Sequence, residues 1–194
     1  MSITHLLYLH GFRSSPLSTK SRAVAARVAA LHPNVTWWCP QLPPSPREAM
    51  ALILQGTAAW PADHMAVVGS SLGGFYATAV AEARGCKVVL LNPAIDPARD
   101  LAKYIGEQTS WHDPAETFYF APHYVDELRA LQSGLAANPS QYFAVIAKGD
   151  EVLDWREMTG RYPGARVKLL EGSDHALGDF DNHIDEVFSF LNLI

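Results

Sequence analysis

Short apolar runs alternate along the chain with longer stretches in which apolar and polar residues recur at helical spacing. Apolar runs of about four to eight residues, rich in Val, Ile and Leu, are typical of strands buried on both faces of a sheet. Six runs predict strands at about 4–10, 35–39, 65–70, 87–92, 142–148 and 166–171. The stretches between and after them predict helices at about 17–31, 46–58, 72–84, 123–137, 153–161 and 180–192. This alternation predicts an α/β fold, in which a mostly parallel sheet of about six strands carries helices on both faces.

The pattern predicts a single domain over 1–194, with one segment that is too long for a simple crossover between parallel strands. This segment, at about 93–140, predicts a small lid insertion. In one interpretation its aromatic side chains form an acyl pocket, and in the other they are core residues over the edge of the sheet. The sequence favours neither interpretation. The aromatic residues are Trp111, Phe118, Tyr119, Phe120 and Tyr124.

The third predicted strand runs into Gly69-Ser70-Ser71-Leu72-Gly73, which matches the Gly-x-Ser-x-Gly pattern of a nucleophile elbow. In such an elbow a strand turns sharply into a helix and exposes the middle serine at the carboxyl edge of the sheet. The middle serine here is Ser71, and not the adjacent Ser70. A Gly/Ser-rich loop without chemistry is the alternative, because the pentapeptide occurs by chance in roughly one chain of this size in twenty. The Val-rich run before it and the helix-compatible run after it favour the elbow.

A serine hydroxyl is a useful nucleophile only when a base takes its proton and a third group orients the base. Downstream of Ser71, one apolar strand ends in Gly149-Asp150, and the next ends in a polar loop that carries His175. Parallel strands would place both residues at the same sheet edge as Ser71. The chain therefore predicts Ser71 as nucleophile, His175 as base and Asp150 as acid, in the order typical of α/β-hydrolases.

Other acidic residues near Asp150 and His175 are alternatives for the third role. Asp154 is better suited to the start of the following helix, where a carboxylate accepts backbone N–H groups. Asp174 adjoins His175, but neighbours in a loop rarely point at each other. Glu151 is expected to face away from Asp150 if the chain stays extended. These considerations favour Asp150.

The negatively charged oxygen of a reacting ester needs hydrogen-bond donors that are already in place. The expected donors are the backbone N–H groups of Leu72, at the start of the helix after the nucleophile, and of Phe12, in the loop after the first strand. Gly11 permits the turn that directs the Phe12 N–H toward the site. The imidazole of His10 is expected to brace this loop through hydrogen bonds and to take no direct part in catalysis.

Several motifs occur in the order that one protein family shows. They are Leu-His-Gly-Phe-x-Ser-Ser-Pro from Leu9 to Pro16, Gly-Ser-Ser-Leu-Gly-Gly from Gly69 to Gly74, Asn92-Pro93-Ala94, Gly-Asp-Glu-Val-Leu-Asp from Gly149 to Asp154, and Ser173-Asp174-His175. On these motifs the chain resembles the small bacterial YqiA-like esterases of the α/β-hydrolase superfamily. The resemblance runs from about Leu7 to the C-terminus and implies a minimal α/β-hydrolase fold. It also implies carboxylester hydrolysis by a Ser71-Asp150-His175 triad.

The composition limits the partners and the compartment. A net charge of −5 without a cluster of Lys and Arg argues against binding to nucleic acid or to an anionic membrane. No apolar stretch is long enough to span a membrane. The only cysteines, Cys39 and Cys86, do not make a disulfide framework, which predicts a reducing, cytoplasmic location. The spacing of the His and Cys residues does not match that of a metal site. The sequence also lacks a Gly-rich phosphate-binding loop, so no cofactor is predicted.

The expected function is that of a serine hydrolase that cleaves small carboxylic esters or thioesters through an acyl-enzyme. One alternative is a cofactor-free perhydrolase or haloperoxidase that uses the same triad. Another is a binding protein that keeps the fold without catalysis. The physiological substrate, the acyl chain length and the oligomeric state stay open at this stage.

Overall fold

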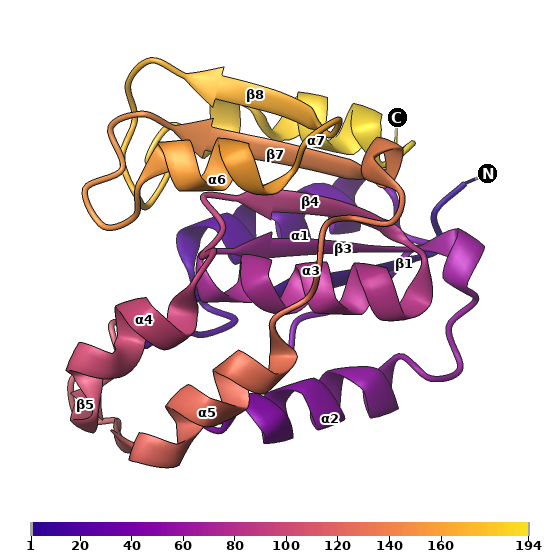
Figure 1. Cartoon of the computed structure of the whole chain (residues 1–194). Helices are drawn as coiled ribbons and strands as arrows, with labels where there is room; N and C mark the ends of the chain where they lie inside the picture. Colours follow the sequence, from indigo (N-terminus) through magenta and orange to yellow (C-terminus); the bar gives the residue numbers. More distant parts are fainter. Residues whose placement is uncertain (1, 194) are drawn as a thin grey trace.

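The computed structural model describes residues 2–193 and contains a parallel sheet of six strands. The strands are β1 (His5–Leu9), β2 (Thr36–Trp38), β3 (Met65–Ser70), β4 (Lys87–Leu91), β7 (Tyr142–Ala147) and β8 (Arg166–Leu170). Their order across the sheet is β2-β1-β3-β4-β7-β8, and every neighbouring pair is parallel (Figure 1). The predicted α/β fold with a parallel sheet is therefore confirmed.

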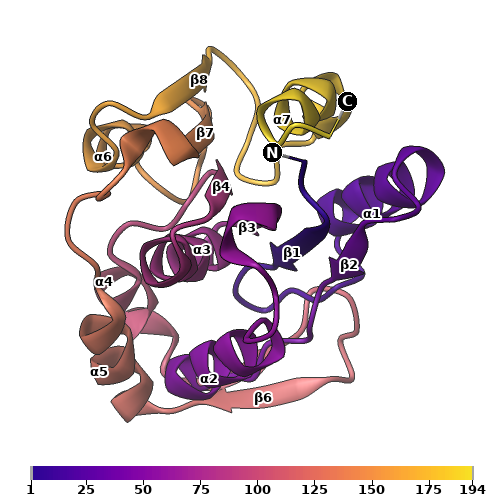
Figure 2. The same ribbon diagram turned by 90° about the vertical axis from the view of Figure 1, so that its right-hand side faces the viewer.

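Helices cover both faces of this sheet, as the sequence predicts. On one face lie α1 (Thr19–Leu31) and α7 (Ile184–Phe190), and on the other lie α2 (Pro46–Gly56), α3 (Leu72–Arg84) and α6 (Trp155–Arg161) (Figure 2). Such two-sided cover is required because a parallel sheet leaves neither face for water. The strand ends, and not the strand faces, are consequently the places open to a ligand.

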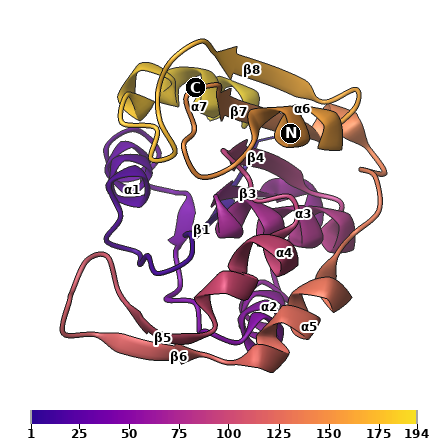
Figure 3. The same ribbon diagram turned by 60° about the vertical axis from the view of Figure 1, so that its left-hand side comes forward.

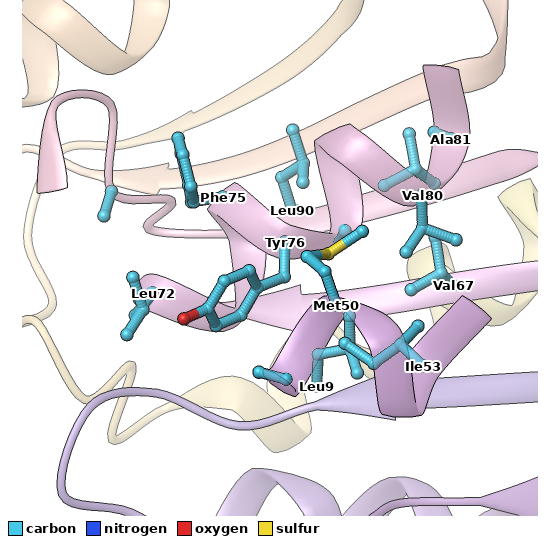
Figure 4. Close-up of a cluster of buried hydrophobic side chains, with 14 of the residues drawn as sticks. Leu9, Met50, Ile53, Val67, Leu72, Phe75, Tyr76, Val80, Ala81 and Leu90 are labelled. Carbon is cyan, nitrogen blue, oxygen red and sulfur yellow. The ribbon is translucent and has the colours of Figure 1, made fainter. Parts of the chain in front are cut away.

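Two hydrophobic cores lie on the two faces of the sheet, because successive side chains of a strand point in opposite directions. From β1, Leu7 and Leu9 enter the core beneath α2 and α3, whereas Leu6 and Tyr8 enter the core beneath α1 and α7. Figure 4 shows the first core, in which Leu9 lies close to side chains of α2 and α3. Full burial of one such leucine contributes about 1.5–3 kcal/mol to the free energy of unfolding.

The segment between β4 and β7 contains more elements than the sequence predicts, and its role as a lid stays a prediction. It contains α4 (Pro97–Leu101), β5 (Gly106–Thr109), β6 (Thr117–Phe120) and α5 (Pro122–Leu131). The antiparallel pair of β5 and β6 forms a second small sheet, apart from the main one (Figure 3). Neither α4 nor this pair was predicted, because α4 has only five residues and β5, with the sequence GEQT, has no apolar run.

Two predicted helices are shorter in the structure. The helix expected at 123–137 ends at Leu131, because Gln132 adopts an extended conformation with a ψ of 113°. The helix expected at 180–192 is divided into a single 3-10 turn, Phe180–Asn182, and the helix α7. Neither difference alters the main sheet.

The structure also bears on the membrane and metal expectations. Between residues 2 and 193, no helix has both the length and the apolar composition that crossing a bilayer requires. The same part of the chain has no group of three or more His, Cys, Asp or Glu side chains placed to hold a metal ion. Cys39 and Cys86 are both free thiols.

Candidate active site

Ser71 lies in the sharp turn between the last residue of β3 and the first residue of α3. Its φ of 54° and ψ of −120° are unusual for a residue with a side chain, as expected for a strained nucleophile elbow. The sharp turn brings α3 very close to the sheet. A Cβ on Gly73 would lie 2.0 Å from the carbonyl oxygen of Leu9, and a Cβ on Gly69 would lie 2.2 Å from that of Gly73. Only glycine fits at these two positions.

The imidazole of His175 lies between Ser71 and Asp150. Its Nε2 is 3.1 Å from the Oγ of Ser71, and its Nδ1 is 2.7 Å from the Oδ2 of Asp150. The side chain of Asp150 has no exposed surface, and its Oδ1 accepts hydrogen bonds from the backbone N–H groups of Val152 and Leu153, both at 2.8 Å. These bonds turn Oδ2 toward the imidazole. The structure thus brings together the three side chains that the sequence singled out.

The alternative acids have other partners. Asp154 caps the start of α6, where its Oδ1 accepts the Arg156 N–H at 2.9 Å. The Oδ1 of Asp174 accepts the Gly178 N–H at 2.9 Å within its own loop. Both carboxylates therefore stabilise local backbone.

Glu151 was discounted as the acid on the condition that the chain stays extended, and this condition is not met. The chain turns after β7 and does not stay extended, so both side chains reach His175. Asp150 contacts the imidazole, whereas the Oε2 of Glu151 accepts the backbone N–H of His175 at 3.0 Å. Glu151 is thus a support of the histidine loop.

Asn92 is a second support, and sequence reasoning assigned it no role. It is fully buried just after β4, with a φ of 41°. Its Nδ2 donates to the carbonyl oxygens of Asp174 and His175, at 2.9 and 3.2 Å, and its Oδ1 accepts the Ala147 N–H at 2.8 Å. One side chain therefore joins the histidine loop to the end of the strand that leads to Asp150. The available sequence signal was a polar residue directly after a buried strand.

Lys20, from α1, is a third support of the same loop. Its Nζ donates to the carbonyl oxygen of Ala176, the residue after His175. Burial lowers the pKa of Lys20 to about 8, although the nearby Asp174 and Asp150 act in the opposite direction.

The loop after β1 lies against the nucleophile. A Cβ on Gly11 would be 3.3 Å from the Cβ of Ser71. His10 braces this loop, because its Nε2 accepts the Leu42 N–H at 3.0 Å and its Nδ1 donates to the Gly11 carbonyl oxygen at 2.9 Å. Burial lowers the pKa of His10, which favours the neutral imidazole that these two bonds require. The expected bracing role of His10 agrees with this geometry.

The two expected oxyanion donors belong to Leu72 and Phe12, which line the same cavity as Ser71. Leu72 is the first residue of α3, so its N–H is one of those that a helix leaves without an internal partner. Phe12 follows Gly11 and lines the same cavity as Ser71 and His175. The assignment of these N–H groups to an oxyanion stays a prediction.

The aromatic residues of the segment 93–140 fall into different environments. Phe120 is 1% exposed and belongs to the core. Phe118 makes an edge-to-face contact with Phe12 and lines a cavity beside it. Trp111 is 68% exposed and lines the two cavities that contain Ser71. Core packing therefore describes Phe120, and cavity lining describes Phe118 and Trp111.

Solved structures with similar folds are numerous, and three illustrate the likeness. A proposed hydrolase from Agrobacterium vitis S4 is 17% identical with a TM-score of 0.76, over 98% of this chain and 91% of that one. Est1E from Butyrivibrio proteoclasticus is 15% identical with a TM-score of 0.73, over 99% and 88%. The monoacylglycerol lipase of Paleococcus ferrophilus is 14% identical with a TM-score of 0.69, over 100% and 96%. At these identities the likeness establishes the fold alone.

The family comparison covers nearly the whole chain. Residues 5–192 match the model of a family described as Uncharacterised protein family (UPF0227). This match spans every strand of the main sheet and includes Ser71, Asp150 and His175. The chain therefore belongs to the family UPF0227, and its fold is that of the α/β-hydrolase superfamily.

Proposed function

We propose that the protein is a serine hydrolase that cleaves small carboxylic esters or thioesters through an acyl-enzyme on Ser71. The observation that carries the proposal is the pair of contacts made by the His175 imidazole. Nε2 lies 3.1 Å from the hydroxyl of Ser71 and Nδ1 lies 2.7 Å from the carboxylate of Asp150. Both distances fall within the range of about 2.6–3.2 Å that proton transfer requires.

In the proposed acylation step, the Oγ of Ser71 attacks the carbonyl carbon of the substrate while Nε2 of His175 takes the hydroxyl proton. Asp150 holds the ring in the tautomer that leaves Nε2 free and stabilises the imidazolium that forms. The backbone N–H groups of Phe12 and Leu72 donate to the carbonyl oxygen as it becomes negative, and the N-terminal end of α3 favours that charge.

The tetrahedral intermediate then collapses and the bond from the carbonyl carbon to the leaving oxygen or sulfur breaks. The imidazolium of His175 gives its proton to the leaving group, so an alcohol or thiol departs. Water takes the place of the leaving group, and His175 removes one of its protons as it attacks the acyl-enzyme. A carboxylic acid is released and Ser71 regains its proton.

The comparison with solved structures also supports this proposal. Est1E and the monoacylglycerol lipase share the fold, and their names denote an esterase and a lipase. The cytoplasm is the proposed compartment, because the free thiols of Cys39 and Cys86 suit a reducing environment.

The test compares two neighbouring serines. Ser71→Ala is expected to lower kcat for p-nitrophenyl acetate on the order of 10⁶-fold and to abolish labelling by a fluorophosphonate probe. Ser70→Ala is the matched control and is expected to retain labelling and most of the activity. Activity that survives in Ser71→Ala contradicts the proposal. A wild-type protein that is inert toward both reagents indicates a binding protein, and turnover only with peroxide indicates a perhydrolase.

A further inference from the structure

Two cavities of different chemistry meet at the pair formed by Ser71 and His175. One has a volume of about 280 Å³ and the other of about 400 Å³, and both are lined by these two residues. Phe12, Trp111 and Val152 also line both cavities. A carbonyl carbon attacked by Ser71 carries an acyl chain on one side and a leaving group on the other. The two parts of an ester can therefore occupy different cavities.

The smaller cavity, called here the apolar cavity, is lined mainly by hydrocarbon. Its walls include Ala94, Pro97, Leu101, Tyr104 and Leu153. Ala94 is part of the hydrophobic core, and Leu101 and Leu153 pack against that core, so the surroundings of this cavity are rigid. Each methylene group that leaves water for such a cavity gains binding free energy.

Three charged side chains line the apolar cavity, those of Arg13, Asp100 and Lys103, and the ammonium group of Lys103 lies 5.2 Å from the ring centre of Tyr104. The Nε of Arg13 donates to the Thr109 carbonyl oxygen at 2.7 Å, and its guanidinium lies 4.2 Å from the ring centre of Trp111. Asp100 accepts a hydrogen bond from Arg99 at 2.8 Å. Each of these charged groups contacts a neighbour, and most of the surface that lines the cavity is hydrocarbon. A volume of about 280 Å³ lies just below the range of about 300–1,000 Å³ typical of pockets for drug-sized ligands.

The larger cavity, called here the polar cavity, has walls that offer hydrogen bonds. It is lined by polar side chains from the loop after β1, the start of α1, the loop before β6 and the turn after β7, namely Ser14, Ser18, Thr19, Lys20, His112 and Glu151. An ammonium group has three N–H donors, and the bond from Lys20 to the Ala176 carbonyl oxygen uses one of them. Hydroxyl, ammonium and imidazole groups therefore converge on a space large enough for an oxygen-rich group.

The course of the reaction decides which part of the ester occupies which cavity. The leaving group receives its proton at His175 and departs, and water then reaches His175 through the space left behind. That space must admit water, which the polar cavity does. The acyl chain remains attached to Ser71 throughout, and an apolar cavity holds it out of water until the second step.

We infer that the enzyme is specific for esters that join an apolar acyl chain of short to medium length to a polar, hydrogen-bonding leaving group. The acyl chain occupies the apolar cavity beside Leu101, and the leaving group occupies the polar cavity beside Thr19 and Lys20. This inference rests on the proposed function and adds the substrate class to it.

The test introduces the same bulky side chain into each cavity. Leu101→Trp fills the apolar cavity, and Thr19→Trp fills the polar one from an exposed position at the start of α1. The kcat/KM is measured on p-nitrophenyl esters from acetate to octanoate, and on the hexanoate esters of butanol and of glycerol. The wild-type protein is expected to prefer the glycerol ester to the butanol ester.

Leu101→Trp is expected to lower the ratio of octanoate to acetate turnover about tenfold and to leave the preference for glycerol unchanged. Thr19→Trp is expected to leave the acyl ratio unchanged and to reduce the glycerol preference about fivefold. The reverse pattern, or the same loss on every ester in both variants, overturns the inference. Hydrolysis of p-nitrophenyl acetate that disappears in Ser71→Ala tests the proposed function separately, because acetate barely enters the apolar cavity.

Discussion

The serine turn and the histidine loop meet in one site, yet the fold holds them in different ways. The serine turn is held by its backbone. The Ser71 N–H donates to the Leu91 carbonyl oxygen and the Ser71 carbonyl oxygen accepts the Ala94 N–H, both at 3.0 Å, while Gly69 and Gly73 allow α3 to pack closely. The histidine loop is held by side chains from elsewhere. Asn92, Glu151 and Lys20 bind its backbone from 83, 24 and 156 residues away in the chain.

Both regions contain residues with strained backbone conformations, but different groups stabilise them. Ser71 has a positive φ, and the tight packing of α3 on the sheet stabilises it. In the histidine loop Ser173 and Leu177 also have positive φ values, of 66° and 50°, although neither is glycine. Such conformations persist only when the surroundings impose them. A strained site can therefore be maintained by local glycines or by distant polar side chains.

The largest effect is expected where the two regions join, at the contact of His175 with its acid. Asp150→Asn is expected to lower kcat about 10⁴-fold, because an amide can present its N–H to Nδ1 and favour the wrong imidazole tautomer. The assay is hydrolysis of p-nitrophenyl acetate. Asp154→Asn is the matched control and is expected to change kcat less than about threefold, because Asn caps a helix nearly as well as Asp. Equal losses in both variants would contradict the geometry.

The second prediction concerns the local support of the serine turn. Gly73→Ala is expected to destabilise the protein by about 3 kcal/mol, because the new methyl group would overlap the Leu9 carbonyl oxygen. Gly160→Ala is the control, since Gly160 lies in α6 with no atom within 4 Å of an added Cβ. It is expected to stabilise the protein by about 0.4–1 kcal/mol. Urea unfolding of both variants checks the difference, and equal midpoints would show that α3 can shift.

The same comparison explains which parts of the structure the sequence could predict. The apolar runs of β3 and β7 and the Gly-x-Ser-x-Gly pattern are local features, so the sheet and the positions of Ser71, Asp150 and His175 followed from them. The contacts of Asn92 join residues 82, 83 and 55 positions apart, and no local pattern reports such pairs. The same holds for β5, a polar strand that exists only because it pairs with β6.

The third prediction tests the distant support of the histidine loop. Asn92→Gly removes all three side-chain hydrogen bonds, and glycine tolerates the φ of 41° without strain. The variant is expected to lower kcat about 10- to 100-fold with little change in KM, because His175 is no longer held at the right distance from Ser71. Asn92→Asp keeps the hydrogen-bond acceptor and loses the donor, and it is also expected to lower kcat with little change in KM. A lower melting temperature with an unchanged kcat would limit Asn92 to a structural role.

The smallest effect is expected at His10, which shows that the loop beside the serine turn also uses a side-chain support. Its Nε2 accepts the N–H of Leu42, 32 residues along the chain. Burial lowers the pKa of His10 in the folded protein, so just below pH 6.5 the unfolded chain binds a proton that the folded protein does not. The free energy of unfolding must therefore fall as the pH falls from about 6.5 toward the lower pKa of the folded state. Urea unfolding over a series of pH values checks this, with His10→Gln as the variant that cannot titrate. The wild-type protein is expected to lose more stability on acidification than the variant, and parallel profiles would show that the brace does not depend on a neutral imidazole.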